Sequence, residues 1–316
     1  MQLKSFSFKT SDGTELWVNR WIPDQDVEIK GLVQLNHGMQ EHSLRYDRLG
    51  SILAENGYVL NAFDMRGHGK TAEMAQQKGK GKLGKIANHG GAKLVIKDLS
   101  EVIQAFKNEY PGKKIALLGH SFGSFVSQGY IEKYHNTLDG VILSGTAGPR
   151  RMMIGAAKVL CRIIQLFKGP DKTSRFLDVI AFGSYNAHIK NPATTVDWLS
   201  KDKMIVQMYN LDQWCGNRPS VSFYKDMMCL LSMIHKPGAI RKIRKELPVY
   251  FIYGTEDPVG DYGKSVENLI GIYKNNGMIN IEYKAYKNDR HEVLNETDKE
   301  KVEKDVLTWL SKTLTE

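Results

Sequence analysis

The chain has 316 residues, of which 41% are hydrophobic and 25% are charged. This composition excludes a disordered chain, which has fewer apolar residues, and a collagen, which needs glycine at about every third position. The 44 Lys and Arg residues outnumber the 35 Asp and Glu residues, for a formal net charge of +9. No zinc-finger spacing, RNP-like motif or long basic tract accompanies this charge, so we expect no nucleic-acid partner.

The three cysteines are Cys161, Cys215 and Cys229, which lie far apart and form no C-x-x-C pair. A scattered, odd set is typical of reduced residues in the core or cap of a cytosolic protein. The chain shows no basic start followed by an apolar leader, and no stretch approaches 18 consecutive apolar residues. We expect a cytoplasmic location and leave peripheral contact with an anionic membrane or micelle surface open.

Apolar runs alternate with helical periods along the first part of the chain, which predicts a mostly parallel sheet with helices on both faces. Strands at 6–9 and 15–22 flank Asp12-Gly13, a hairpin signal. Further strands are predicted at 31–36, 58–63, 115–119 and 141–144, separated by helices at 44–56, 93–110 and 122–134. The polar stretch 70–91 is predicted to be a mobile surface loop.

After Ser144 the alternation stops. Residues 146–236 show helical patches rich in Met, Trp and Tyr but no convincing strand. Strand, helix, strand and helix then resume at 248–253, 264–275, 279–286 and 299–314. The sequence therefore predicts an α/β core in two parts, 1–145 and 237–316, with a helical cap, 146–236, inserted after the sixth strand.

The pentapeptide Gly119–Gly123 has the pattern G-x-S-x-G between a predicted strand and a predicted helix. This context is typical of a nucleophile elbow, in which Ser121 projects from a sharp turn. The helix that starts after the serine directs main-chain N–H groups at a developing oxyanion. We predict that Ser121 is a nucleophile.

A nucleophilic serine needs a base, and the base needs an acid that fixes its tautomer. In the elbow fold these partners follow in the order Ser, Asp or Glu, His. Asp257 comes just after the strand 249–253, with Glu256 as the rival carboxylate, and we favour Asp257 because it precedes a proline in a turn. His291 is the only histidine after Asp257, so it is predicted to be the base. Asn295 stands where an H-E-x-x-H zinc motif needs its second histidine.

The strand 32–35 leads into the loop 36–42, and in this fold the corresponding loop supplies one oxyanion donor. We predict that the main-chain N–H groups of Met39 and Phe122 form the oxyanion hole. His37 and His42 in the same loop are predicted to be structural, since His291 already fills the role of base.

Three motifs together resemble a known group of enzymes. The segment His37–Tyr46 resembles the H-G-x-x-E-H-S-x-R-Y segment of monoacylglycerol lipases and bacterial lysophospholipases, Asp64–Gly69 resembles their D-x-R-G-H-G turn, and Gly119–Gly123 resembles their G-H-S-x-G elbow. Asp257 and His291 complete the set. The resemblance spans the predicted core and implies the α/β-hydrolase fold, with a helical cap over a lipid-accepting pocket. It also implies structural roles for Asp64, Arg66 and His68, with Arg66 paired to a nearby acid.

We therefore expect a serine hydrolase that cleaves carboxylic esters through an acyl-enzyme, with monoacylglycerol or lysophospholipid as substrate and no cofactor or metal. Four alternatives remain open from the residues alone. The same triad serves esterases of small non-lipid esters and aminopeptidases or amidases, because the elbow does not encode the leaving group. An acyltransferase and a lipid carrier that has lost catalysis are the other two.

The predicted cap begins with a basic amphipathic helix at 150–169, which contains no acidic residue. Its apolar residues recur at spacings of three or four: Met152, Met153, Ala156, Val159, Leu160, Ile163 and Phe167. Such a face either packs on the core or lies on a lipid surface. We favour packing, because every cap helix must bury one face.

Overall fold

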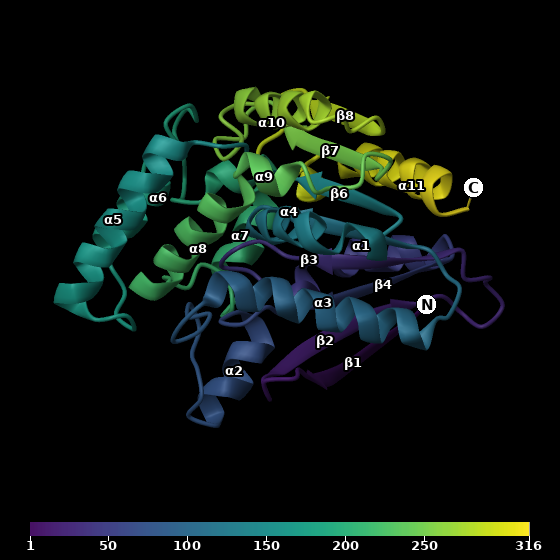
Figure 1. Cartoon of the computed structure of the whole chain (residues 1–316), viewed down its shortest axis with the longest axis horizontal. Helices are drawn as coiled ribbons and strands as arrows, with labels where there is room; N and C mark the ends of the chain where they lie inside the picture. Colours follow the sequence, from purple (N-terminus) through teal and green to yellow (C-terminus); the bar gives the residue numbers. More distant parts are fainter. Residues whose placement is uncertain (316) are drawn as a thin grey trace.

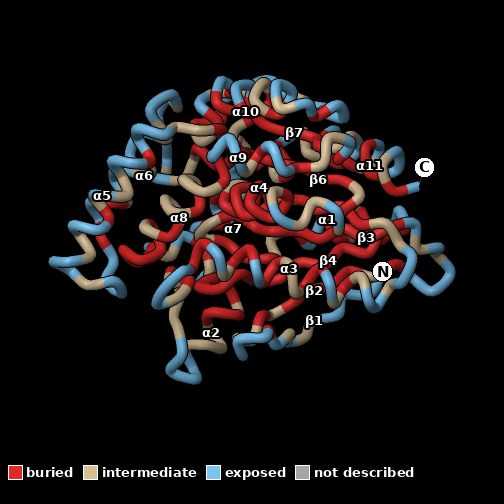
Figure 2. The backbone as a smooth tube through the Cα atoms, viewed as in Figure 1, coloured by how far each residue is buried: buried red, intermediate tan, exposed pale blue. Residues whose placement is uncertain are grey.

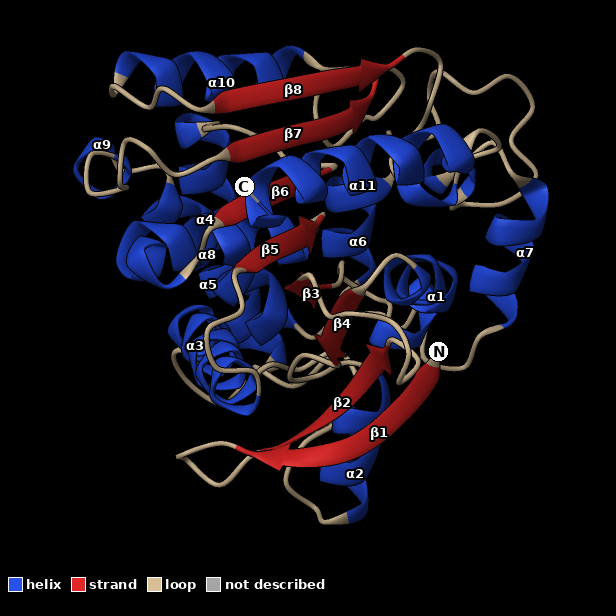
Figure 3. Ribbon diagram, turned by 90° about the vertical axis from the view of Figure 1, so that its right-hand side faces the viewer, coloured by secondary structure: helices blue, strands red, loops and turns tan. Residues whose placement is uncertain are grey.

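Residues 1–315, which the computed structural model describes, contain a single eight-stranded sheet with the strand order β1-β2-β4-β3-β5-β6-β7-β8. The pairs β1/β2 and β2/β4 are antiparallel and all other pairs are parallel, which confirms the predicted mostly parallel sheet. The strands are β1 Gln2–Lys9, β2 Glu15–Ile22, β3 Gly31–Asn36, β4 Tyr58–Phe63, β5 Ile115–His120, β6 Gly140–Ser144, β7 Val249–Gly254 and β8 Ile281–Tyr286. Figure 3 shows the twist of this sheet, which ends in the β1–β2 hairpin.

Helices cover both faces of the sheet (Figure 1). Apolar side chains of α3, α4, α8 and α10 form the core against one face, and those of α1 and α11 form the core against the other. The helices are α1 Asp47–Glu55, α2 Gly69–Gln77, α3 Gly91–Glu109, α4 Phe122–Tyr134, α5 Arg151–Lys168, α6 Arg175–Phe182, α7 Lys203–Leu211, α8 Val221–Ile234, α9 Pro237–Ile240, α10 Lys264–Asn275 and α11 Lys299–Thr315.

The central strands consist almost entirely of buried apolar residues because both of their faces are covered. In β3, for example, Leu32 belongs to the core on one face of the sheet and Val33 to the core on the other, which follows from the alternation of side chains along a strand. The carboxyl ends of β3, β5, β7 and β8 meet at one edge of the sheet. The loops after these four strands carry the predicted site residues.

Helices α5–α8 follow β6 and precede β7, within the predicted insertion 146–236. Helix α8 packs into the main core through Phe223, Leu230 and Ile234, whereas α5 lies at the outside of the molecule (Figures 1 and 2). We propose that 146–236 acts as a cap on a core formed by 1–145 and 237–316, of which Glu316 lies outside the described residues. No helix within residues 1–315 combines the length and apolar character needed to cross a membrane.

The prediction of a mobile loop at 70–91 is wrong for its first part, which forms helix α2. Asp64 accepts a hydrogen bond from the main-chain N–H of Lys70 at 2.7 Å, and Thr71 Oγ1 donates to the carbonyl of Asp64 at 2.7 Å. Thr71 Oγ1 in turn accepts from the main-chain N–H of Trp17 on β2. The run Ala-Glu-Met-Ala-Gln-Gln within this stretch has high helix propensity, so the polar character that suggested a loop belongs to the exposed face of a helix.

The interpretation that the apolar face of α5 packs on the core is also wrong. Met152 and Phe167 are 91% and 86% exposed, and Val159 and Ile163 are about half exposed. The helix instead packs on α8, and its fully buried residues are Ile154 and Cys161. The face that it buries is rotated from the one that the spacing indicated, so most of the predicted apolar face is in contact with solvent.

Candidate active site

Ser121 lies at the junction of β5 and α4, in a backbone conformation with φ 51° and ψ −120°. A non-glycine residue with positive φ is strained, and such strain clusters at functional sites. The main-chain N–H of Ser121 donates to the carbonyl of Ser144 on β6 at 2.9 Å, which holds the turn against the sheet. Gly119, two residues before the serine, has no room for a side chain, because a Cβ there would come within 2.4 Å of Ser127 Oγ.

The side chains of His291 and Asp257 are in contact, and His291 lines the same cavity as Ser121. His291 Nδ1 lies 2.9 Å from Asp257 Oδ1, and both side chains are almost fully buried. Asp257 Oδ1 also accepts from the main-chain N–H of Val259 at 2.8 Å, which fixes the carboxylate in its turn. Burial alone would lower the pKa of His291, but the carboxylates of Asp257, Glu292 and Glu41 together outweigh it, so the pKa is raised. The rival carboxylate, Glu256, is exposed.

His291 Nε2 faces away from Asp257 and has no hydrogen-bond partner among the described residues. Ser121 and His291 line the same cavity, so the free imidazole nitrogen and the serine hydroxyl share one space. A catalytic hydrogen bond is often loose before substrate binds. The arrangement leaves Nε2 available to accept a proton.

The predicted oxyanion donors line this cavity as well. Phe122 is the first residue of α4, whose first four N–H groups have no partner within the helix. Within residues 1–315, the main-chain N–H groups of Met39 and Phe122 donate to no protein acceptor. Two unpaired N–H groups beside a serine hydroxyl can stabilise negative charge on a carbonyl oxygen.

The other histidines of the motifs have structural contacts. His37 Nε2 accepts from the main-chain N–H of Met65 at 3.0 Å, and its Nδ1 lies 2.7 Å from the carbonyl of Gly38. His68 Nδ1 lies 3.0 Å from the carbonyl of Arg66. Burial lowers the pKa of His37 and His68, to about 4 for His68, so both rings are neutral near pH 7.

The acidic and basic residues of the D-x-R-G-H-G turn are paired, as the resemblance implied. Arg66 forms two hydrogen bonds with Asp98 on α3, at 2.5 and 2.7 Å, and a third with Asp12 at 2.8 Å. Asp64 accepts from the main-chain N–H of Ser43 at 2.8 Å, in addition to its contact with the start of α2. These contacts hold the turn against the β1–β2 hairpin and α3, which is a structural role.

The site opens into a cavity of about 300 Å³ between the core and α5–α8. Its larger part is apolar and is lined by Ile154, Leu160, Leu177, Phe182, Met227 and Leu231, among others. Its polar end is lined by Glu41, Arg45 and Glu292, which form a buried ion cluster. Among the Met residues of the segment 146–236, Met153, Met227 and Met228 line the cavity, whereas Met204 and Met208 are 63% exposed.

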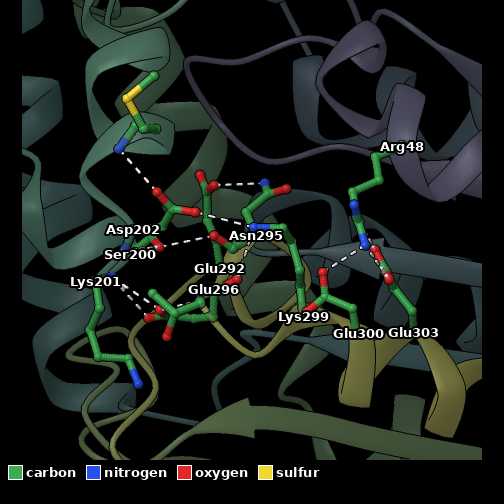
Figure 4. Close-up of polar contacts among 12 residues, drawn as sticks. Arg48, Ser200, Lys201, Asp202, Glu292, Asn295, Glu296, Lys299, Glu300 and Glu303 are labelled. Carbon is green, nitrogen blue, oxygen red and sulfur yellow. Dashed lines mark hydrogen bonds and ion pairs between the residues drawn. The ribbon is translucent and has the colours of Figure 1, made fainter.

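Sequence reasoning did not find the contact between the cap and the loop that carries His291. The main-chain N–H groups of His291 and Glu292 donate to the carbonyls of Trp198 and Leu199, at 3.3 and 2.8 Å. The ring of Trp198 packs 5.1 Å from that of His291. The neighbouring polar contacts, from Ser200–Asp202 to Glu296 and Lys299, continue this strip (Figure 4). We call residues 197–202 the anchor strip.

One group of potential metal ligands occurs among the described residues. The ligand atoms of His42, Asp212 and Cys215 all lie within 4.8 Å of one another. His42 Nε2 and Asp212 Oδ2 already pair at 2.8 Å, which links the loop after β3 to the cap. Burial raises the pKa of the Cys215 thiol, so it stays protonated. The contact between His42 and Asp212 explains why these ligand atoms lie close together, so we assign no metal to this group.

Comparison with known proteins agrees with this architecture. Residues 27–298 match the family described as Hydrolase_4, serine aminopeptidase, S33. A monoacylglycerol lipase of Mycolicibacterium smegmatis is 25% identical over 321 aligned positions, covering 96% of this chain and 95% of that protein.

Solved structures are similar over nearly the whole chain. A thermostable carboxyl esterase from Bacillus coagulans in complex with glycerol has a TM-score of 0.89 and 26% identity, with 99% of each chain covered. A soluble variant of the Saccharomyces cerevisiae monoglyceride lipase with a substrate analogue, 22% identical, shares the fold with a TM-score of 0.74, covering 100% of this chain and 95% of that one. The chain therefore belongs to the serine aminopeptidase S33 family, as a hydrolase of the α/β-hydrolase group that includes monoacylglycerol lipases and lysophospholipases.

Proposed function

We propose that this protein is a serine hydrolase that cleaves carboxylic esters of lipids. Ser121 attacks the ester carbonyl, and His291 Nε2 takes the serine proton and returns it to the leaving alcohol. Asp257 orients the imidazole and stabilises its charged form. The N–H groups of Met39 and Phe122 hold the oxyanion, and water then releases the acyl group from Ser121.

A single observation carries this proposal. Ser121, at a strained strand-to-helix turn, shares one cavity with the unpartnered Nε2 of His291, whose Nδ1 faces Asp257. The role of nucleophile accounts for the positive φ of this serine and for the two unpaired main-chain N–H groups beside it.

The two ends of the cavity suggest the substrate class. The apolar part accommodates an acyl chain beside the serine. At the polar end, Arg45 is already neutralised by Glu41 and Glu292. A phosphate would have to compete with both carboxylates for this guanidinium, whereas an uncharged glycerol would not. We therefore favour monoacylglycerol over lysophospholipid, in line with the names of the relatives.

The ion cluster also bears on the aminopeptidase alternative. Two carboxylates and one guanidinium leave one formal negative charge, which suits the free amine of a peptide substrate. However, the carboxylate oxygens of Glu41 and Glu292 are all engaged by Arg45, Tyr46, Asn295 or the N–H of Gly38. The negative charge is therefore already balanced in large part by fixed protein donors, which weakens its attraction for an amine and favours the ester over the peptide.

The exposed side of the cap suggests how lipid reaches the cavity. Exposed apolar residues lie on the neighbouring helices α5 and α6 and form what we call the cap surface: Met152, Met153, Val159, Ile163, Leu166, Phe167, Phe176, Val179 and Ile180. Arg151, Arg162 and Lys168 are exposed on α5 as well. An apolar surface of this size marks an interaction site, and its basic flank suits anionic lipid. We propose that the cap surface makes peripheral contact with an anionic membrane or micelle.

The test of the proposed function is a substrate series with Ser121→Ala as control. Hydrolysis of p-nitrophenyl esters of increasing chain length, monoacylglycerol, lysophosphatidylcholine and aminoacyl-anilides is measured under the same conditions. Long-chain monoacylglycerol turnover that disappears in Ser121→Ala is the expected result. Turnover of short esters or aminoacyl-anilides alone would support the small-ester or aminopeptidase alternatives. Activity that persists in Ser121→Ala would overturn the assignment of the nucleophile.

A further inference from the structure

A buried cluster of side chains joins the loop after β3 to the loop after β8. Arg45 Nη1 donates to Glu41 at 2.6 Å and to Glu292 at 2.8 Å, and its Nη2 donates to the second oxygen of Glu292 at 2.7 Å. Tyr46 donates to Glu41 at 2.9 Å, and the ring of Tyr209 covers the guanidinium at 5.0 Å. Arg45 thus bridges two carboxylates that lie about 250 residues apart in the sequence, 41 and 292.

On one side, the cluster fixes the loop that carries a proposed oxyanion donor. Glu41 Oε1 accepts from the main-chain N–H of Gly38, directly before Met39. After Met39, Gln40 has φ 60° and its carbonyl accepts from the N–H of Gly216 in the cap at 3.0 Å. The residues on both sides of Met39 are therefore held, Gly38 by the carboxylate that Arg45 binds and Gln40 by the cap.

On the other side, the cluster fixes the loop of the proposed base. Glu292 directly follows His291, and its main-chain N–H donates to Leu199 in the anchor strip. Asn295 also donates to the Glu292 carboxylate, at 2.8 Å (Figure 4). Its bond adds to the two from Arg45, which already engage both carboxylate oxygens. Burial would raise the pKa of Glu292, but the Arg45 guanidinium lowers it to about 2, so the ion pair persists at any working pH.

We propose that Arg45 is a positioning residue. Through Glu41 and Glu292 it holds the oxyanion donor Met39 and the base His291 in the correct position relative to each other. The proposal rests on the catalytic roles assigned above. The planar guanidinium is suited to this task because it binds Glu292 with two parallel bonds and Glu41 with the second N–H of Nη1, a geometry that an ammonium group cannot reproduce. Misplacement of a catalytic group by about 1 Å costs about 100-fold in rate.

The alternative is that Arg45, which lines the cavity, binds the head group of the substrate. The two roles differ in what they change. A positioning residue acts on the chemical step for every ester, so its loss lowers kcat for a p-nitrophenyl ester and for monoacylglycerol by the same factor. A head-group ligand raises KM for monoacylglycerol and leaves the p-nitrophenyl ester unaffected, because that ester has no glycerol.

The experiment compares Arg45→Lys and Arg45→Met with Arg48→Met, using both esters. Arg48 lies three residues further along, on α1, and also pairs with two carboxylates, Glu303 at 2.7 Å and Glu300 at 2.8 Å (Figure 4). Unlike Arg45, it does not line the cavity. We expect kcat to fall about 10- to 100-fold in both Arg45 variants with both esters, with KM within about twofold, and Arg48→Met to match the unaltered protein. A loss confined to KM for monoacylglycerol would overturn the proposal.

A second variant keeps the test valid if the Arg45 variants fail to fold. Glu292→Gln preserves the size of the side chain and its contact with Asn295 but removes one charge that faces His291. The other charged or titratable groups near His291 are Asp257, Glu41 and His120. Since the Glu292 carboxylate raises the pKa of His291, we expect lower kcat and an acid limb of kcat/KM shifted to lower pH. An unchanged kcat and pH profile would refute the proposal.

The outcome is distinguishable from a failure of the proposed function. If the unaltered protein hydrolyses neither ester, the catalytic assignment fails and this inference fails with it. If the unaltered protein is active and the Arg45 and Glu292 variants behave like Arg48→Met, only the positioning role is wrong.

Discussion

Gly123, in the first turn of α4, lies so close to Asn36 at the end of β3 that a Cβ on the glycine would be 2.2 Å from the Asn36 carbonyl oxygen and 2.4 Å from that of His37. The two strand ends that carry the proposed nucleophile and the proposed oxyanion loop are therefore in direct contact. The absence of a side chain at residue 123 sets the distance between them.

This contact predicts that Gly123→Ala lowers both stability and activity. The backbone carbonyls cannot rotate away like a flexible side chain, so α4 or β3 must shift at a cost of about 1–3 kcal/mol or more. We expect a lower melting temperature and a loss of kcat, because Met39 follows the displaced segment. The matched control is Gly155→Ala on α5, where a Cβ would meet open space. A Gly123→Ala protein with unchanged kcat would show that the two loops are independent.

The choice between the two adjacent carboxylates is directly testable. Asp257 is fully buried and faces His291, whereas Glu256 is exposed. We expect Asp257→Asn to reduce kcat/KM about 10⁴-fold, because the imidazole loses the acceptor that sets its tautomer. Glu256→Gln should leave kcat/KM unchanged. A large loss in Glu256→Gln with little in Asp257→Asn would reverse the assignment.

Asp226 on α8 makes the stability of the protein dependent on pH. It is 5% exposed and lies against Gly91 at the start of α3. Burial raises its pKa to about 6, against the opposing effects of Lys225, the N–H of Gly91 and His89. Between about pH 4 and 6 the folded protein holds a proton that the unfolded chain has lost, so stability falls as pH rises through this window, by up to roughly 3 kcal/mol.

The measurement is the free energy of unfolding in urea at pH 4.5 and pH 8, for the unaltered protein and Asp226→Asn. The amide cannot ionise, so the variant should gain stability relative to the unaltered protein at pH 8 and less at pH 4.5. Other titrating groups contribute equally to both proteins and cancel in the comparison. If the free energies of unfolding of the two proteins differ by the same amount at pH 4.5 and at pH 8, Asp226 does not titrate in this window.

The proposed lipid contact predicts binding that depends on charge and on the cap surface. We expect tighter binding to anionic than to neutral vesicles, weakening as salt increases. Leu166→Ser and Phe167→Ser, which change side chains that are 84% and 86% exposed, should weaken binding to vesicles without changing kcat on a soluble short-chain ester. Ile279→Ser, 70% exposed and close to β8 outside the cap, is the control. Equal binding by all variants would remove the cap surface as the contact.

The sequence predicted the sheet and its order of elements because buried parallel strands and amphipathic helices leave strong local patterns. The motif around Ser121 combined such a pattern with a specific spacing, and the order of residues then left His291 as the one candidate base. The strand, helix and elbow predictions use information that lies within a few residues of each position, and the assignment of His291 adds the order of the three residues along the chain.

Other features were missed because they depend on contacts between distant residues. Helix α2 is held by Asp64 and Trp17, and the bond from His291 to Trp198 joins positions 93 residues apart. The burial of α5 was misjudged for the same reason: spacing indicates that a helix has an apolar face, but only the position of α8 determines which face is covered.

The anchor strip has a consequence for engineering this enzyme. Arg290 donates to the carbonyls of Asp197 and Ser200, at 2.7 and 3.0 Å, and Lys201 Nζ donates to Asp289 at 2.7 Å. This part of the insertion is therefore bound to the loop that carries His291, the proposed base. A chimera that exchanges the whole segment 146–236 for that of another hydrolase would also replace the backing of His291. Grafts that exchange α5 and α6 but retain residues 197–202 leave that backing intact, which makes the outer helices the exchangeable part.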